Sequence, residues 1–360
     1  MNINSTSVTR KLIILLIVLV FVYFGKDFLM PLVIGGILAT LFLPLCKWIE
    51  GKKIHKGIAS LTCLLILIII AASAISLLGW EISELTNDFA MIKIKAIETG
   101  DKIQEYIYNK LGISFEMQLQ ILKEEQPSIG GIMQSLGNSF SAILTSFILV
   151  LAYVFLLLYY RGHIRQFILK LTDHTDHGNM LKVIYSITHV SQQYLIGLAK
   201  MIICLWILYG IGFSILGLKN AIFFAVLCGL LHIIPFIGNI IGTSITVLVA
   251  TIQGASLPLV LGVVAIYAII QFIEGWVFEP LILGRQVKIN PLFTILALVF
   301  GELIWGISGV FLAIPITAMV KTICDHFDSL KPYGFLMSEI KNKKSELKII
   351  KSVKKIYIKK

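Results

Sequence analysis

Polar side chains set within apolar runs are the residues of this sequence most able to do chemistry. Gln271 and Glu274 interrupt the stretch QFIEGWVFEPLILGRQVKINPLF and, three positions apart, share one face of a helix. An ionisable group within a membrane-spanning segment is costly and usually faces the interior of a helix bundle. Glu274 is therefore predicted either to bind a proton or cation or to make a buried structural hydrogen bond.

A second stretch, LLHIIPFIGNIIG, combines helix breakers with polar side chains. Pro235, Gly238 and Gly242 would free backbone N–H and C=O groups, which a bilayer tolerates only where they are buried in protein or face water. Discontinuous helices of this kind build substrate and ion sites in transporters. We predict a re-entrant or discontinuous element that lines a path, with Asn239 and His232 as candidate ligands. A packing kink is the alternative for the break, and for His232 a packing role is favoured over a proton relay.

Three further charged residues are candidates of the same kind. Ideal α-helical geometry places Glu279 about 140° around the helix from Glu274. Lys200 either extends its ammonium to the membrane surface, which we favour, or pairs with Glu274 across the bundle. Glu302, beside Gly301, is the next intramembrane carboxylate. The full set of predicted binding and path-lining residues is Glu274, Gln271, Pro235, Gly238, Asn239, His232, Glu279, Glu302 and Lys200.

Glycines and prolines that interrupt or tighten helices flank these residues. Small residues in GISGVFLAIPITAM allow two helices to approach closely. We expect helix breaks or close packing at Gly242, Gly275, Pro280, Gly306, Gly309 and Pro315.

The elements that hold these residues are predicted to be transmembrane helices. Of 360 residues, 57% are hydrophobic and 14% charged, whereas soluble domains have about 45–50% apolar and about 25% charged residues. A spanning helix needs roughly 20 apolar residues. The sequence therefore predicts an all-α, polytopic membrane protein of about eight transmembrane helices. A broken or re-entrant helix pair is expected in the C-terminal half, together with a long amphipathic helical insert.

The apolar segments give the positions of the expected crossings. They are 12–25, 29–46, 57–80, 139–160, 194–217, 220–252, 257–280 and 292–322. The segment 220–252 is too long for one simple helix and is expected to break at 235–238. The first segment resembles a secretory signal, but no small-residue cleavage site follows, so we expect an uncleaved crossing.

These segments divide the chain into five parts. Residues 1–80 hold three N-terminal crossings, 81–138 an extracytoplasmic amphipathic insert, and 139–189 the fourth crossing with a cytoplasmic amphipathic segment. Residues 190–322 form a C-terminal transport bundle with broken helices, and 323–360 form a basic cytoplasmic tail. The insert is expected to be a lid or packing arm, with a partner-binding or oligomerisation surface as the alternative.

Lysine and arginine set the expected orientation. The net charge is +11, and basic residues gather near the N-terminus, in 47–56, in 161–189 and in the C-terminal tail. The positive-inside rule then places both termini in the cytoplasm, and no nucleic-acid partner is expected. The tail is expected to remain solvated, or alternatively to lie on anionic lipid.

Other activities find little support in the sequence. The five cysteines form no CxxC pair, and neither a metal nor a cofactor is expected. The GISG motif matches a rhomboid pattern, but a serine protease needs a histidine base within reach, and the only later histidine is His326. The run DHTDHGN has metal-ligand chemistry but is typical of a polar turn. No GxxxxGK[ST] loop occurs, so uphill transport would need a gradient or a separate subunit.

The C-terminal motifs resemble those of the autoinducer-2 exporter family of bacterial permeases. The similarity is strongest over 220–322. It rests on the Ile-Pro-aromatic-x-Gly break at 234–238 and the Gln-x-x-Glu-Gly motif at 271–275. The proline at Pro280 and the Gly-x-x-Gly-x-x-x-Ala-x-Pro end at 306–315 complete it.

This resemblance implies a permease or exporter of a small solute such as autoinducer-2, driven by a gradient rather than acting as an enzyme. Some relatives resemble sodium/proton antiporters, so cation/proton exchange is the alternative, and a non-transporting channel or structural protein is a third. The family also implies a homo-oligomer in the bacterial inner membrane.

Overall fold

The protein is built from helices in the part of the chain that the structure, a computed structural model, describes. These residues are 5–87, 129–172, 176–235, 237–283 and 289–339, with isolated positions between 104 and 117. Within them, six helices are long and apolar enough to cross a membrane, and two shorter apolar helices accompany them. The predicted all-α, polytopic membrane fold is thereby confirmed. The insert at 81–138 and the tail at 323–360 lie largely outside the described residues.

The element order follows the predicted crossings closely. The helices are α1 (Ser5–Phe24), α2 (Lys26–Gly51), α3 (Lys56–Asn87), α6 (Ile129–Lys170), α7 (His177–Ile215), α8 (Ala221–Leu231), α9 (Ile237–Ile252), α10 (Leu257–Ile273), the π-helix η2 (Glu274–Leu283), α11 (Pro291–His326) and α12 (Lys331–Met337). Only Gly25 separates α1 from α2. The polar segment before residue 194 is helical as well, so α7 is longer than expected.

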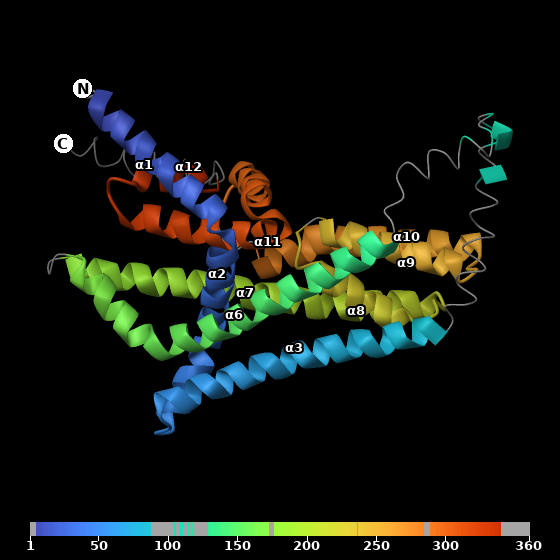
Figure 1. Ribbon diagram of the computed structural model, residues 1–360, viewed down its shortest axis with the longest axis horizontal. Helices are drawn as coiled ribbons and strands as arrows, with labels where there is room; N and C mark the ends of the chain where they lie inside the picture. The colour runs from blue at the N-terminus through green and yellow to red at the C-terminus, as the bar shows by residue number, and fades with distance from the viewer. Residues whose placement is uncertain are drawn as a thin grey trace, which may run out of the picture.

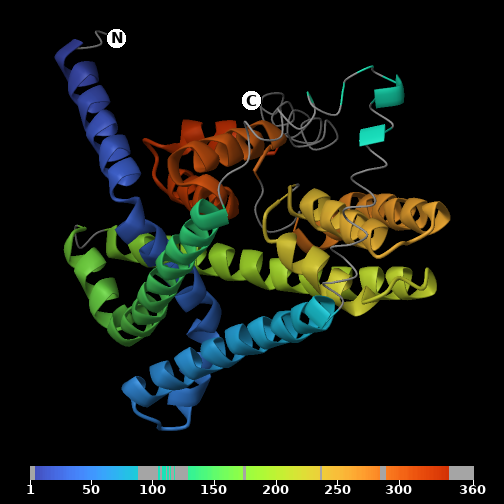
Figure 2. The ribbon, with the colours of Figure 1, turned by 45° about the vertical axis from the view of Figure 1, so that its right-hand side comes forward.

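Three clusters of buried side chains hold the helices together, one of which joins α2, α7 and α11 through Ile37, Tyr194 and Leu312. Another lies among α2, α3 and α6 and includes Cys46 and Val154. The third lies among α7, α8, α9 and α10 and includes Leu205, Tyr209 and Phe224. Figure 2 shows α9 and α10 stacked over α7 and α8, with α3 on the opposite side.

The helices α8 and α9 form a hairpin, and the described residues of its turn are 232–235. A Cβ at Gly238 would overlap the Leu231 carbonyl oxygen, and one at Gly242 would lie 3.0 Å from the Cys228 Cα. Only glycine therefore lets the two arms pack this closely. The predicted helix break at 235–238 is confirmed, and it reverses the chain direction.

The prediction of one crossing at 292–322 is wrong in one respect, because α11 folds back on itself at Gly306. Gly306 has φ 61° and ψ −145°, a conformation open essentially to glycine alone. A Cβ at Gly309 would overlap the Gly301 carbonyl oxygen, although residues eight apart in a straight helix lie about 12 Å apart. The indole Nε1 of Trp305 donates to the Val22 carbonyl at 3.0 Å and so ties the tip to α1.

Asn290 joins the start of α11 to the end of α12. Its Nδ2 donates to the Leu336 and Ser338 carbonyls at 2.7 and 3.3 Å, and its Oδ1 accepts from the Phe293 N–H at 2.9 Å. One side chain thus caps the first arm of α11 and holds α12, which follows the second arm.

Replacing Asn290 by alanine is expected to release α12. Each lost hydrogen bond costs about 1 kcal/mol, so limited proteolysis near residue 338 should become faster in the variant. Asn290→Ser is the matched control, since serine keeps the N-cap acceptor but cannot reach the α12 carbonyls. If alanine and wild type are cut at the same rate, Asn290 does not hold α12.

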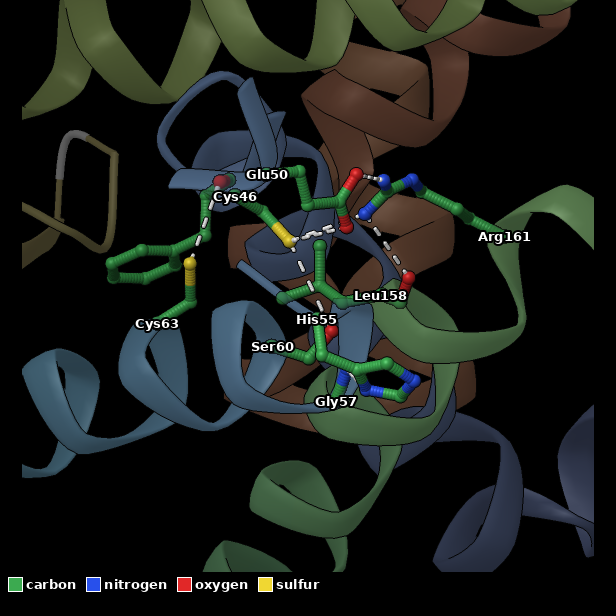
Figure 3. Close-up of polar contacts among 9 residues, drawn as sticks. Cys46, Glu50, His55, Gly57, Ser60, Cys63, Leu158 and Arg161 are labelled. Carbon is green, nitrogen blue, oxygen red and sulfur yellow. Dashed lines mark hydrogen bonds and ion pairs between the residues drawn. The ribbon is translucent and has the colours of Figure 1, made fainter. Parts of the chain in front are cut away.

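A charged cluster joins the C-terminal end of α2 to α6 near the 52–55 loop (Figure 3). Arg161 forms an ion pair with Glu50 through Nη2 and donates from Nη1 to the Cys46 sulfur at 3.1 Å. The Cys46 sulfur also lies 3.8 Å from the Ser60 hydroxyl, which brings α3 into the cluster. Both charged side chains are mostly buried, with 24% and 19% exposed.

Arg161→Met is expected to lower the stability of the purified protein by about 1–3 kcal/mol, because a mostly buried Glu50 would lose its charged donor. The ion pair Lys331–Asp328 is the control, since both side chains are largely exposed and Lys331→Met should have an effect near zero. Thermal unfolding in detergent compares the two. Equal shifts in Tm would show that the Glu50–Arg161 pair contributes no more than a surface pair.

Candidate functional site

A buried polar site lies where the turn of the α8–α9 hairpin meets the junction of α10 and η2. Glu274, at this junction, is only 8% exposed, and Asn239 and His232 from the hairpin are 2% and 7% exposed. The fold thus brings Glu274 into contact with Asn239, which follows the helix break, although the two residues belong to separate sequence motifs.

Asn239 links the hairpin to the carboxylate. Its Nδ2 donates to Glu274 Oε2 at 2.7 Å and to Gln271 Oε1 at 3.4 Å. The Nδ1 of His232 lies 3.3 Å from Glu274 Oε1, which is within ion-pair distance, but the two atoms lack hydrogen-bond alignment. The first turn of α9 is therefore held to the Glu274 carboxyl group by the Asn239 side chain.

Hydroxyl and thiol groups extend the site along α9. Thr246 donates to the Gly242 carbonyl at 2.8 Å and lies 3.7 Å from the Cys228 sulfur. The hydroxyl of Tyr209 on α7 lies beside Thr243, one turn before Thr246. A row of buried polar side chains, Asn239, Thr243 and Thr246, therefore runs along α9 away from Glu274.

Four buried polar atoms of this site have no aligned hydrogen-bond partner among the described residues. They are Tyr209 OH, Thr243 Oγ1, His232 Nδ1 and Asn239 Oδ1. An unsatisfied buried polar group costs about 1–3 kcal/mol, and proteins rarely leave several together. They lie in two neighbouring pairs, Tyr209 with Thr243 and His232 with Asn239, whose poorly aligned contacts leave hydrogen-bonding capacity for a polar ligand or ion.

The π-helix η2 begins at Glu274 itself. Short π-helical segments occur frequently at functional sites. The expected angle of about 140° between Glu274 and Glu279 assumed an α-helix and is wrong, because the segment that contains both is π-helical. The Glu279 and Pro280 side chains lie outside the described part, whereas their backbone belongs to η2.

Two of the other predicted ligands, Lys200 and Glu302, are exposed rather than part of the buried polar site, whereas Pro235 lies in the hairpin turn beside it. Lys200 is exposed on α7, as snorkelling requires, and no ion pair joins it to Glu274 in the described residues. Glu302 is exposed on the first arm of α11. Pro235 lies in the hairpin turn, where its carbonyl accepts from the Ile237 N–H at 2.7 Å.

The glycine and proline positions divide into three roles. Gly242 and Gly309 serve close packing, as expected, and Gly306 reverses the chain. A Cβ at Gly275 would meet nothing within 4 Å, so close packing does not require glycine there. Pro315 is buried within the second arm of α11.

Sequence reasoning missed Tyr209, Cys228, Thr243 and Thr246. The threonines were detectable, since with Asn239 they recur at the four- and three-residue spacing of one helix face. Tyr209 and Cys228 lie in apolar stretches of α7 and α8 whose sequence carries no such signal. No group of three potential metal ligands occurs in the described ranges, and residues 173–175 of the DHTDHGN run fall outside them.

A broken helix that faces a buried carboxylate inside an apolar helical bundle is the architecture of a membrane transporter. The chain belongs to the AI-2E transporter family, because the model of that family, described as AI-2E family transporter, matches residues 12–329. It is 24% identical to "Putative transport protein YrrI" of Bacillus subtilis, over 84% of this chain and 87% of that protein. It is 22% identical to "AI-2 transport protein TqsA" of Escherichia coli, over 94% and 97% respectively.

Proposed function

We propose that this chain moves a small solute across the membrane by gradient-driven exchange at the Glu274 site. The observation that supports this proposal is the contact of Asn239 Nδ2 with Glu274 Oε2 at 2.7 Å. Protonation of Glu274 would weaken the hydrogen bond that holds the first turn of α9, because a neutral carboxyl group is a poorer acceptor than a carboxylate. Proton binding and movement of the hairpin are thereby coupled.

The solute is proposed to be autoinducer-2 or a molecule of similar size, as the name of TqsA suggests. Sodium/proton exchange is the second candidate, since carboxylate, amide and hydroxyl oxygens together suit a hard cation. A channel or structural role without coupled transport is the third. The buried Glu274 argues against this third candidate, because an ionisable residue inside the membrane is energetically costly and usually has a function.

We also propose that both termini lie in the cytoplasm of a bacterial inner membrane. The Glu50–Arg161 pair and the contact of Ser186 with His326, at 3.5 Å, bring basic segments far apart in sequence to one end of the molecule. That end faces the cytoplasm under the positive-inside rule. The basic tail is then available to anionic lipid.

A homo-oligomer is proposed from the exposed face of the first arm of α11. Leu296, Val299, Phe300 and Leu303 are exposed there beside the carboxylate of Glu302. A carboxylate in contact with hydrocarbon is costly, and contact with a second copy would shield it.

The test uses purified protein in liposomes with an internal pH dye. Sodium, lithium or potassium gradients are imposed in turn, and uptake of labelled autoinducer-2 is measured in parallel. Cation-dependent proton flux would support exchange, and autoinducer-2 uptake without cation-dependent flux would support the exporter. If neither differs from empty liposomes, the transport proposal is refuted.

A further inference from the structure

A groove lies between α9 and α10 beside the polar site. Its volume is about 550 Å³, within the range of pockets that hold small molecules. It is lined by Ile240, Thr243, Ser244, Val247, Leu248, Thr251, Ile252, Val264 and Tyr267.

The groove follows one side of α9 from the hairpin turn to the far end of the helix. Between Ile240 and Ile252 the helix rises about 18 Å. Because the hairpin turn lies at Glu274, the groove connects the polar site with the 253–256 loop. That loop lies at the opposite end of the molecule from α12 (Figure 1).

The two ends of the groove differ in chemistry. At the inner end, the buried Thr243 hydroxyl lies beside the Tyr209 hydroxyl and belongs to both the groove and the polar site. Toward the outer end the wall is formed by Val247, Leu248 and Ile252, and the Thr251 hydroxyl donates to the Val247 carbonyl at 2.8 Å. The groove therefore matches a molecule with a polar head and an apolar body.

The polar site next to the inner end of the groove sets the kind of head group. It holds the Glu274 carboxyl group, which accepts hydrogen bonds when ionised, and Asn239 Oδ1, which only accepts them. A head that donates hydrogen bonds is therefore favoured over an anionic one.

We propose that the α9–α10 groove is the apolar subsite and outward route of the transported solute, a small amphiphile whose donor-bearing head enters the polar site. This proposal rests on the proposed transport function and names the class of its substrate. It predicts that the groove opens to water on the outer side of the membrane in at least one state of the transport cycle.

The test places single cysteines on the groove, as Val247→Cys and Thr251→Cys. A membrane-impermeant methanethiosulfonate reagent is applied to intact cells expressing each variant, and to inverted vesicles. The wild type serves as the blank, since four of its five cysteines are buried. Ala250→Cys is the matched control, because Ala250 lies on the same helix but is 1% exposed, within the core.

Labelling from outside is expected at both groove positions and not at position 250. Hexylamine at about ten times its Kd should slow labelling about tenfold, by simple occupancy, whereas hexanoate should not. Labelling only by a membrane-permeant maleimide would make the groove a lipid contact and overturn the proposal. Labelling only in inverted vesicles, or equal protection by hexanoate, would also overturn it. Cation or autoinducer-2 flux in the same variants reports the transport function separately, so either idea can fail alone.

Discussion

Glu274→Gln is expected to reduce proton flux in liposomes to the level of vesicles without protein. Glutamine keeps the size of the side chain, and its Oε1 can still accept from Asn239 Nδ2, so the hairpin contact is retained in weaker form. What is lost is the group that gains and releases a proton. Internal pH recorded after an imposed cation gradient measures the effect.

Two matched variants separate the role of charge from that of the fold. Glu302→Gln removes an exposed carboxylate and is expected to leave the flux of a single chain near the wild-type value. Glu274→Asp keeps a titratable group but shortens it, so partial flux is expected. Wild-type flux in Glu274→Gln would show that the carboxylate is not the proton carrier and would leave a structural hydrogen bond as its role.

Gly238→Ala is expected to be the most disruptive single-methyl change in the described part of the transport bundle. The added Cβ would overlap the Leu231 carbonyl oxygen, which belongs to the backbone and cannot rotate away. Overpacking in a close-packed interior costs about 1–3 kcal/mol, and a shift of α9 would also move Asn239 away from Glu274. Both the Tm in detergent and the transport rate should therefore fall.

Gly275→Ala provides the comparison, since a Cβ there meets nothing within 4 Å. It should leave the Tm close to that of wild type. Equal loss of stability in the two variants would mean that backbone freedom rather than close approach decides the effect at Gly238.

The sequence was sufficient to predict the helical membrane fold and the two halves of the polar site. Long apolar runs determine helices in a bilayer because no other backbone arrangement satisfies its polar groups there, closed barrels aside. Glu274 and the 235–238 break were recognisable because a charge and a proline are both unusual within such runs.

Two features could not be predicted in this way. Hydropathy reports how apolar a segment is but not whether the chain reverses within it. It therefore did not distinguish the α11 hairpin from one crossing. The reversal depends on a single backbone conformation at Gly306 and on contact between Gly301 and Gly309. The position of Tyr209 beside Thr243 depends on how α7 rotates against α9, which tertiary packing decides.

The fold of α11 also bears on how the chain enters the membrane during synthesis. A run of 36 residues with mean hydropathy 2.1 in its most apolar window would be received by the insertion machinery as a single spanning helix. The finished structure instead requires residues 290 and 338 to remain together on one side. The arm from Pro291 to Trp305 and the arm that follows Gly306 must therefore be inserted as a pair that enters and leaves on one side, rather than as one crossing.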